Sequence, residues 1–419
     1  MSESEKTTPT PRLSGFLRKF IASPLRFAAM AVLMSLFSTV FVGRVTNAII
    51  GKPTYKVWVV GDFTNSGKHR AIRDGFDPDR GSRTKIDDCD IEFHVWDDKG
   101  DLSRAGGISQ DLAGRNDTLL VVGHMRSTNT KEALKAYLHA DPPIPVILTT
   151  ETNPDLAPPR QAAGERHPLI RLSATDKAQA RDAAKFALDK AESFWVVEDT
   201  SNPVYSHGLA LEFIRNVQES EKKGRVLLWS TTLTTPSVDT IREMKPQCIF
   251  FAGLWSNALI LIRQVNAMNL QNGRRFFILS DASVEQDLIR YGGNEELANV
   301  YLMHPMRASE LPRPDEAYTR YGQAARKLVD QLINEVADGF EDSRRRDHLP
   351  GHILKRAIGI HRVGDGREVL QKVIMDYPRL EKPIDGTDDF TYRPELGLSE
   401  TNKTFKVWKV AGGRFADGP

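Results

Sequence analysis

The sequence has little cysteine and no recognisable metal-binding motif. Its 419 residues include two cysteines, Cys89 and Cys248, which fall in segments that we assign to different halves of the chain. A stabilising disulfide is therefore not expected, although export would permit one. Neither cysteine has a C-x-x-C spacing and no H-E-x-x-H occurs, so we expect no metal site and no other cofactor.

An excess of charge of one sign is also missing. The 57 basic and 55 acidic residues are interspersed and give a formal net charge of +2, so no long-range field favours nucleic acid as a partner. The short run at residues 344–346 is typical of a solvated surface. No G-x-S-x-G elbow is present and neither cysteine has an acid–base partner nearby, so we expect no enzyme, although an α/β fold by itself excludes none.

The loop around Gly67 and Lys68 invites comparison with a phosphate-binding loop. A Walker A motif needs four residues between its glycines and a Ser or Thr after the lysine. Here five residues separate Gly61 from Gly67, and His69 follows the lysine. Nucleotide hydrolysis is therefore not expected.

One long apolar run does occur, close to the N-terminus. Residues 1–26 are polar and basic, and residues 27–42 then form an uninterrupted run of apolar and small residues, which predicts a transmembrane or signal segment over 27–48. The run is a little long for the core of a signal peptide and a little short for a spanning helix, so its length does not decide between an anchor and a signal peptide cleaved after Ala48. A buried core helix is a third alternative. The basic residues before it favour a cytoplasmic N-terminus. The globular part is then extracytoplasmic, in the periplasm, tethered to the inner membrane unless the segment is cleaved.

From residue 55 onward, apolar strands alternate with helices. Continuous apolar strands between helices predict parallel sheets covered on both faces, and the pattern restarts after residue 173, so we expect an α/β fold with two doubly wound sheets. The predicted strands are 55–61, 91–96, 118–123, 145–149, 170–173, 194–198, 225–229, 248–252, 275–279 and 404–410. The predicted helices between them are 66–76, 103–115, 130–139, 176–192, 206–222 and 256–270.

Doubly wound sheets bind ligands at the carboxyl ends of their strands, and polar residues gather there. Ser127 and Thr128 follow the third strand at the start of a helix, where hydroxyls and free amides suit a carboxylate. Thr128 could instead be a simple N-cap. Thr150 and Thr152 follow the fourth strand, and turn chemistry explains these threonines less well than ligand binding does.

Two candidates come from the second half of the chain. Tyr205 lies just before a predicted helix and could cover a ligand. Asp281 follows a strand and could hold an ammonium group by a charge-assisted hydrogen bond. As single residues, tyrosine and aspartate at such positions are more often caps or surface groups than ligand contacts.

Several segments together resemble one known family. GHMRSTNT, TTETNPDL, RLSATDKAQARDAAKFAL, YSHGLALEF and TFKVWKVAGGRF are similar, in this order, to the leucine/isoleucine/valine-binding proteins of ABC transporters over residues 55–415. The resemblance implies a type I periplasmic-binding-protein clamshell, with two Rossmann-like lobes joined by a multi-strand hinge. Lobe 1 would comprise 54–173 and about 304–395, and lobe 2 would comprise 174–303 and about 396–419.

The resemblance also implies roles for individual residues. By position, Ser127 and Thr152 would bind the ligand α-carboxylate and Thr150 would offer a backbone carbonyl to the ammonium. Tyr205 and Asp281 would close over the ligand from the second lobe. Two further candidates stand where the family pattern differs: Arg126 precedes the binding serine, and Trp255 follows Leu254 where a family tyrosine often contacts ligand.

These implications lead to two functional hypotheses. In the first, the chain is a solute-binding protein that captures an amino acid or similar zwitterion by hinge closure and delivers it to an ABC permease. In the second, it is a membrane-tethered sensor or receptor component with the same fold and no transport role, acting on a signalling partner. Cleavage of the N-terminal segment would favour the first, and its retention the second.

Overall fold

The structure is a computed structural model, and it describes residues 54–80, 85, 89–156, 168–222, 224–232, 236–268, 275–306, 308–311, 314–346, 370, 390–393, 398–401 and 405–419. Residues Thr54–Phe340 and Val363–Pro419 form one compact unit that contains the main sheets. The predicted membrane segment, residues 27–48, lies outside the described residues. Of the helices in the described part, none is both long and apolar enough to cross a bilayer.

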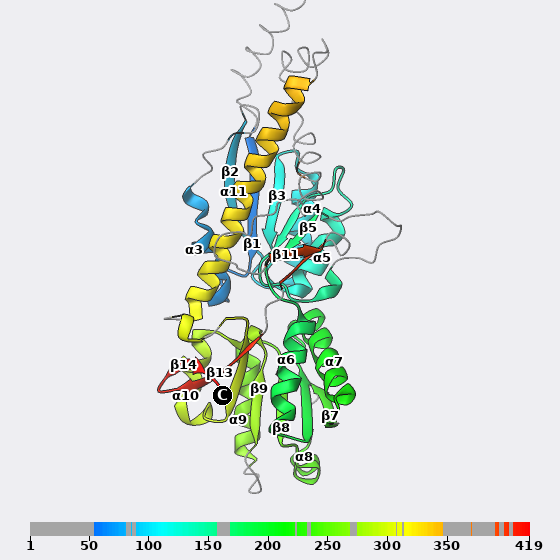
Figure 1. Ribbon diagram of the computed structural model, residues 1–419, viewed down its shortest axis with the longest axis vertical. Coiled ribbons are helices and arrows are strands. Elements are labelled where there is room, and N and C mark those ends of the chain that lie inside the picture. The colour runs from blue at the N-terminus through cyan, green and yellow to red at the C-terminus, as the bar shows by residue number, and fades with distance from the viewer. Residues whose placement is uncertain are drawn as a thin grey trace, which may run out of the picture. The chain divides into compact units, whose positions relative to one another are not determined.

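The first sheet is fully parallel and has the strand order β2-β1-β3-β4-β5. Its strands are β1 (Thr54–Gly61), β2 (Asp90–Asp97), β3 (Thr118–Gly123), β4 (Val146–Leu148) and β5 (Leu169–Arg171). The helices that pack against it are α3 (Gly67–Phe76), α4 (Leu102–Gly114), α5 (Ser127–Tyr137) and α11 (Pro314–Arg346). Figure 1 shows α11 lying along this sheet.

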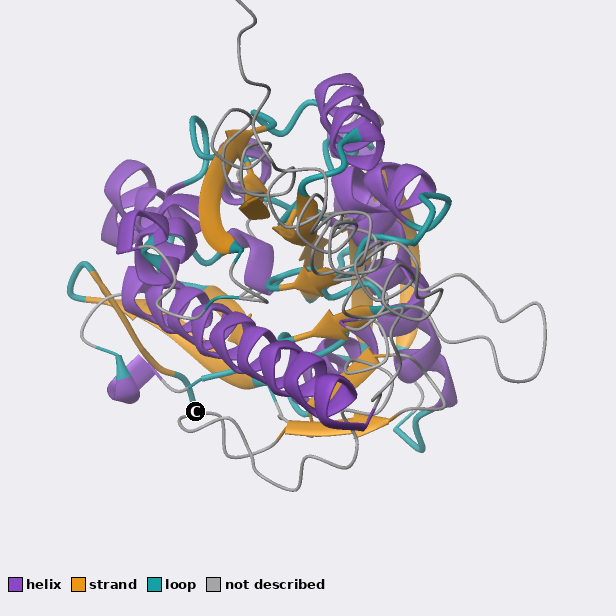
Figure 2. Ribbon diagram, turned by 90° about the horizontal axis from the view of Figure 1, so that it is seen from above, coloured by secondary structure: helices purple, strands orange, loops and turns teal. Residues whose placement is uncertain are grey.

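Side-chain alternation explains why this sheet is covered on both faces. In β1, Val57 and Val59 belong to a buried cluster with residues of α3 and α11. Trp58 and Val60 point the other way, into a cluster with residues of α4 and α5. Because both sets are apolar, each face must be covered by helices, and Figure 2 shows helices on both sides of the strands.

The second sheet repeats this plan with two added strands. Its order is β14-β13-β10-β9-β8-β6-β7, in which β7-β6-β8-β9-β10 are parallel and β13 and β14 are antiparallel. The strands are β6 (Ser193–Glu198), β7 (Arg225–Thr231), β8 (Cys248–Ala252), β9 (Phe276–Leu279), β10 (Val300–His304), β13 (Lys406–Ala411) and β14 (Arg414–Asp417). The accompanying helices are α6 (Asp176–Leu188), α7 (Pro203–Glu219), α8 (Val238–Met244), α9 (Trp255–Ala267) and α10 (Gln286–Glu296).

The chain passes between the two sheets more than once. It leaves the first sheet after β5, and it returns after β10, since α11 packs into the core of the first sheet. It then contributes β13 and β14 to the edge of the second sheet. A separate hairpin of β11 (Phe390–Arg393) and β12 (Leu398–Thr401) contacts β5. The α/β prediction with two doubly wound sheets is thereby confirmed.

Some predicted boundaries were wrong. Helix α5 begins at Ser127 rather than residue 130, and α7 begins at Pro203, so Tyr205 lies inside the first turn of its helix. Proline is favoured in the first helical turn because it has no amide hydrogen to leave unpaired there. The predictions also lacked α8, α10, β10 and β14.

Candidate functional site

A cavity of about 280 Å³ lies where the carboxyl ends of strands from both sheets come together. Its walls follow β1, β3 and β4 of the first sheet and β6, β8 and β9 of the second. The strand order reverses between β1 and β3 in the first sheet and between β6 and β8 in the second, which is where doubly wound folds open a crevice. Six predicted residues line this cavity: Arg126, Ser127, Thr150, Tyr205, Trp255 and Asp281.

Helix α5 brings Arg126 and Ser127 to the cavity. Ser127 is the first residue of the helix and is buried, so its hydroxyl and the free amides of the first turn lie at the partly positive end of the helix. The guanidinium of Arg126 forms an ion pair with the buried carboxylate of Asp62, 2.6 Å away. The charge of Arg126 is therefore largely compensated within the protein.

A buried carboxylate shapes the loops after β3 and β4. Glu151 is fully buried and accepts hydrogen bonds from the backbone amides of Met125 and Thr150, both at 2.8 Å, and from the Thr130 hydroxyl at 3.2 Å. The Thr150 hydroxyl donates to the carbonyl oxygen of Met125 at 3.2 Å. These bonds fix Thr150 at the cavity but engage its hydroxyl proton inside the protein.

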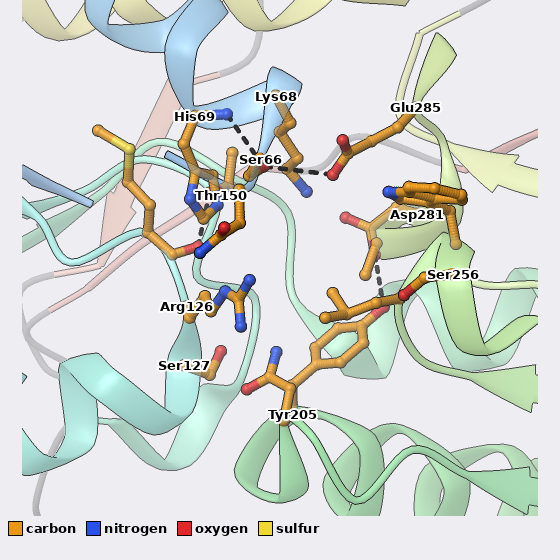
Figure 3. Close-up of a pocket in the computed structure, with 16 residues that line it drawn as sticks. Ser66, Lys68, His69, Arg126, Ser127, Thr150, Tyr205, Ser256, Asp281 and Glu285 are labelled. Carbon is orange, nitrogen blue, oxygen red and sulfur yellow. Dashed lines mark hydrogen bonds between the residues drawn. The ribbon is translucent and has the colours of Figure 1, made fainter. Parts of the chain in front are cut away.

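On the opposite wall, Tyr205 and Asp281 contact each other (Figure 3). The Tyr205 hydroxyl donates to Asp281 Oδ1 at 2.6 Å, and Gln179 Nε2 donates to the same oxygen at 2.8 Å. Burial, followed by the charge of Asp281, raises the pKa of Tyr205 well above its usual value, so this hydroxyl stays protonated and able to donate. Asp281 thus presents a carboxylate that is oriented by two neutral donors, with its second oxygen available.

Thr128 does not line the cavity. Its hydroxyl donates to Asn202 Oδ1 at 2.7 Å and accepts from the backbone amide of Val204 at 3.1 Å. Asn202 precedes α7, so these bonds join the N-terminal ends of α5 and α7, one from each sheet. In this structure Thr128 therefore holds the two halves of the site together.

Thr152 is likewise absent from the main cavity. It is buried and lines a much smaller adjoining cavity of about 10 Å³, together with Thr150, Lys68 and Asp281. A space of that size holds about one water molecule. The two threonines predicted as a pair are therefore separated, with Thr150 at the main cavity and Thr152 behind it.

Two charged residues that line the cavity, Lys68 and Glu285, were not predicted from the sequence. Lys68 lies in the first turn of α3, in the segment whose spacing does not match a phosphate-binding loop. Glu285 immediately precedes α10. Burial raises the pKa of Glu285 to about 7, and the nearby charge of Lys68 partly offsets this. The signal that could have found both is their position shortly after the carboxyl ends of β1 and β9.

A third missed residue, His69, is held in its neutral form. It is buried, and burial, followed by the charge of Arg126, lowers its pKa well below the usual value. The Nδ1 atom accepts a hydrogen bond from the Asp62 amide at 3.3 Å. His69 therefore adds shape and polarity to the cavity but no positive charge.

The remaining wall is apolar. Met125, Leu254, Trp255 and Ala282 line it, and the indole of Trp255 stacks on the ring of Tyr291 with centroids 5.7 Å apart and planes 8° apart. Stacking holds a broad, flat surface against the cavity. The site thus combines polar groups from both sheets with one apolar wall.

This fold, with a cavity between the carboxyl ends of two doubly wound sheets, is that of the type I periplasmic binding proteins, and it matches solved substrate-binding proteins of branched-chain amino-acid ABC transporters. No family model matches the sequence, and no curated protein matches it either. The predicted resemblance is therefore confirmed in three dimensions, where the fold is conserved at low sequence identity.

Three solved structures illustrate the likeness. Leucine-binding protein LivK from Thermotoga maritima has a TM-score of 0.62 at 17% identity, covering 87% of this chain and 98% of its own. LivJ from Streptococcus pneumoniae, in complex with isoleucine, has a TM-score of 0.58 at 17% identity, covering 86% and 97%. A solute-binding protein from R. palustris, in complex with benzoate, has a TM-score of 0.58 at 15% identity, covering 87% and 95%. At these identities the likeness concerns the fold.

Proposed function

We propose that this chain is an extracytoplasmic solute-binding protein that captures an amino acid or a similar small zwitterion by hinge closure, for ABC-type transport. The observation that carries the proposal is the cavity itself, which has hydrogen-bond donors on one wall and the oriented carboxylate of Asp281 on the other. A zwitterion has complementary ends for such walls. The proposed ligand-binding residues are Ser127, Thr150, Tyr205 and Asp281, with Arg126 and Trp255 beside them.

The size and lining of the cavity support a ligand of amino-acid size. A volume of about 280 Å³ lies just below the usual range for ligand sites, roughly 300–1,000 Å³, which suits a small ligand. Polar groups at the carboxyl ends of the strands would hold the head of the ligand. The apolar wall of Leu254 and Trp255 would then receive its side chain.

The proposed lobes are 54–173 with about 304–395, and 174–303 with about 396–419. Contacts that join the two sheets at the cavity, such as Thr128 with Asn202, would then stabilise the closed form. Opening would break these contacts and expose the site. Thr152, behind Thr150, would act on the ligand only through its neighbours.

We expect a ligand screen to detect binding directly. The full chain, purified in detergent, is heated with each of the common amino acids and small carboxylates in turn. A ligand at a hundredfold excess over its dissociation constant stabilises the folded state by about 2.7 kcal/mol, which should raise the melting temperature by a few degrees. If no compound in the panel raises it, an amino-acid ligand is excluded at the concentrations used.

We also expect residues 27–48 to direct the globular part across the membrane. A phosphatase fused after Pro419 should then be active in intact bacterial cells, since this reporter works only outside the cytoplasm. A matched fusion that lacks residues 1–53 should be inactive. Activity typical of a cytoplasmic reporter in the full-length fusion would contradict the proposed location and the transport role with it.

A sensor or receptor component is the second candidate. One solved structure with this fold is described as an extracellular ligand-binding receptor from Rhodopseudomonas palustris, with a TM-score of 0.59 at 12% identity. The N-terminal segment separates the two candidates. Mass determination of the membrane-extracted protein would show whether the segment is retained, as a fixed sensor requires, or cleaved, as a free carrier requires.

A further inference from the structure

Lys68 places a positive charge deep in the cavity. It is the second residue of α3, directly after the N-cap Ser66 and Gly67, and its side chain lines both the main cavity and the small one behind it. Only 7% of the residue is exposed. Figure 3 shows the ammonium of Lys68 pointing into the space between Thr150 and Asp281.

This ammonium has no anionic partner among the residues that the structure describes. It forms no ion pair and donates no hydrogen bond there, and its Nζ lies over the ring of Tyr318, 4.9 Å from the ring centroid. A buried ammonium without a partner is costly. The N-terminal end of α3 adds to this cost because it is itself partly positive, and no acidic residue occupies its first turn.

The other charged residues around the cavity form no ion pair with the ammonium of Lys68. Arg126 is compensated by Asp62, whereas Lys68 lines the cavity and forms no ion pair with any residue in the described ranges. Asp281 is already held by the donors Tyr205 and Gln179.

Glu285 is also held by a neutral donor. Its Oε1 accepts a hydrogen bond from the Ser66 hydroxyl at 3.2 Å, and it acts on Lys68 only through space. An anionic group of a bound ligand would therefore give the ammonium of Lys68 an ion-pair partner.

The threonines predicted as ligand-binding residues offer little to a carboxylate. Thr128 bonds to Asn202, Thr150 bonds to the carbonyl oxygen of Met125, and Thr152 lies outside the main cavity. Ser127 lines the cavity, and its hydroxyl has no such bond to another residue of the described part of the chain. The acid end of a ligand therefore needs an anchor beyond the threonines.

We propose that Lys68 is this anchor, binding an anionic group of the ligand, so that the cavity selects carboxylates over their amides and other neutral analogues. The inference rests on the proposed function because it uses the same cavity. It goes further in assigning the decisive acid-binding role to α3 of the first sheet. The ligand class that follows is a small carboxylate whose acid group reaches the first turn of α3.

The experiment compares the full-length protein with three variants by calorimetric titration in a low-chloride buffer. Lys68→Met removes the charge and keeps the length of the side chain, and Lys68→Arg keeps the charge. Lys131→Met removes the same charge from an exposed position on α5 and is the matched control. The probes are L-leucine, L-leucinamide, 4-methylpentanoate, acetate and inorganic phosphate, and melting temperature confirms that each variant is folded.

The expected result is that carboxylates bind the wild type at least tenfold more tightly than the amide does. Lys68→Met should weaken carboxylate binding by about ten- to hundredfold, since a hydrogen bond to a charged group is worth about 1.5–3 kcal/mol. Lys68→Arg should recover part of the loss, and Lys131→Met should behave as the wild type.

The remaining outcomes separate the two proposals. If leucine binds equally well to wild type and Lys68→Met, or the amide binds as tightly as the acid, the Lys68 anchor is wrong and the proposed function stands. If only acetate or phosphate binds, and Lys68→Met abolishes this binding, the anchor stands and the amino-acid function is wrong. If no anion in the panel binds the wild type, the anchor is wrong as well.

Discussion

Replacing Asp281 with alanine is expected to weaken the binding of an amino-acid ligand by at least about thirtyfold. Asp281 is 8% exposed, and two neutral donors hold its Oδ1, which leaves Oδ2 for the ammonium of the ligand. Removing one partner of a desolvated, hydrogen-bonded charge pair costs about 2–5 kcal/mol. Calorimetric titration with the amino acid that stabilises the protein most would measure the loss.

Two further variants test whether charge or shape is responsible. Asp281→Asn keeps the size and some hydrogen bonding, so it should recover only a small part of the affinity. Tyr205→Phe removes one donor to Oδ1 without changing the charge, and its effect should be much smaller than that of Asp281→Ala. Equal affinity in wild type and Asp281→Ala would show that no ammonium is recognised there, and the sensor hypothesis with a different ligand would become the better one.

The strands and their order of appearance were predictable because their physical signal is local. β3 and β8 are continuous apolar runs buried on both faces, as parallel strands between helices must be. β10, with the sequence VYLMH, was not predicted, although it is as long as the predicted strand β8. Its identity is decided by pairing with β9 and β13, which are distant contacts.

The general location of the site was also predictable, because doubly wound sheets bind ligands at the carboxyl ends of their strands. This rule led to Ser127, Thr150 and Asp281, which the structure places at one cavity. It could not separate Thr150 from Thr152, however. The chain bends after β4 and Glu151 turns inward to bond the Met125 amide, so the alternation of an extended strand no longer decides which threonine faces the cavity.

Lys68 and Glu285 were missed for a related reason. In the sequence, Lys68 stands out only as part of a possible nucleotide-binding motif. The spacing of that motif is wrong, so nothing else marked Lys68 as a site residue. What makes it a site residue is the approach of Asp281, Tyr318 and Glu285, which lie more than two hundred positions along the chain. No local pattern contains that information.

A second large effect is expected from Asp176→Asn, which should make the protein more stable above neutral pH. Asp176 is fully buried at the start of α6, and no described donor makes a well-formed hydrogen bond to either carboxyl oxygen. Burial raises its pKa to about 8, and the charge of Asp281 adds to this, while Thr152 and Arg171 partly oppose it. Folding therefore favours the protonated acid, which asparagine imitates.

The sign of the pH dependence follows from linkage. Because the pKa of Asp176 is higher in the folded than in the unfolded chain, its contribution to stability is complete below about pH 4 and is lost as the pH rises through about 8. The free energy of unfolding of Asp176→Asn, measured by urea denaturation, should match the wild type near pH 4. It should exceed the wild type by about 2–5 kcal/mol at pH 8.5.

Two matched variants make this comparison specific to Asp176. The pKa of Glu285 is also raised, to about 7, so its ionisation also lowers the free energy of unfolding as the pH rises. Glu285→Gln should therefore remove a separate and smaller part of this pH dependence, the part that is complete near pH 7. Asp239→Asn changes a carboxyl whose side chain is 93% exposed, and it should leave the slope unchanged because water solvates the charge in both states. An Asp176→Asn variant that is less stable than the wild type at pH 8.5 would show that the ionised carboxylate supports the fold, with the charge of Arg171 acting on it.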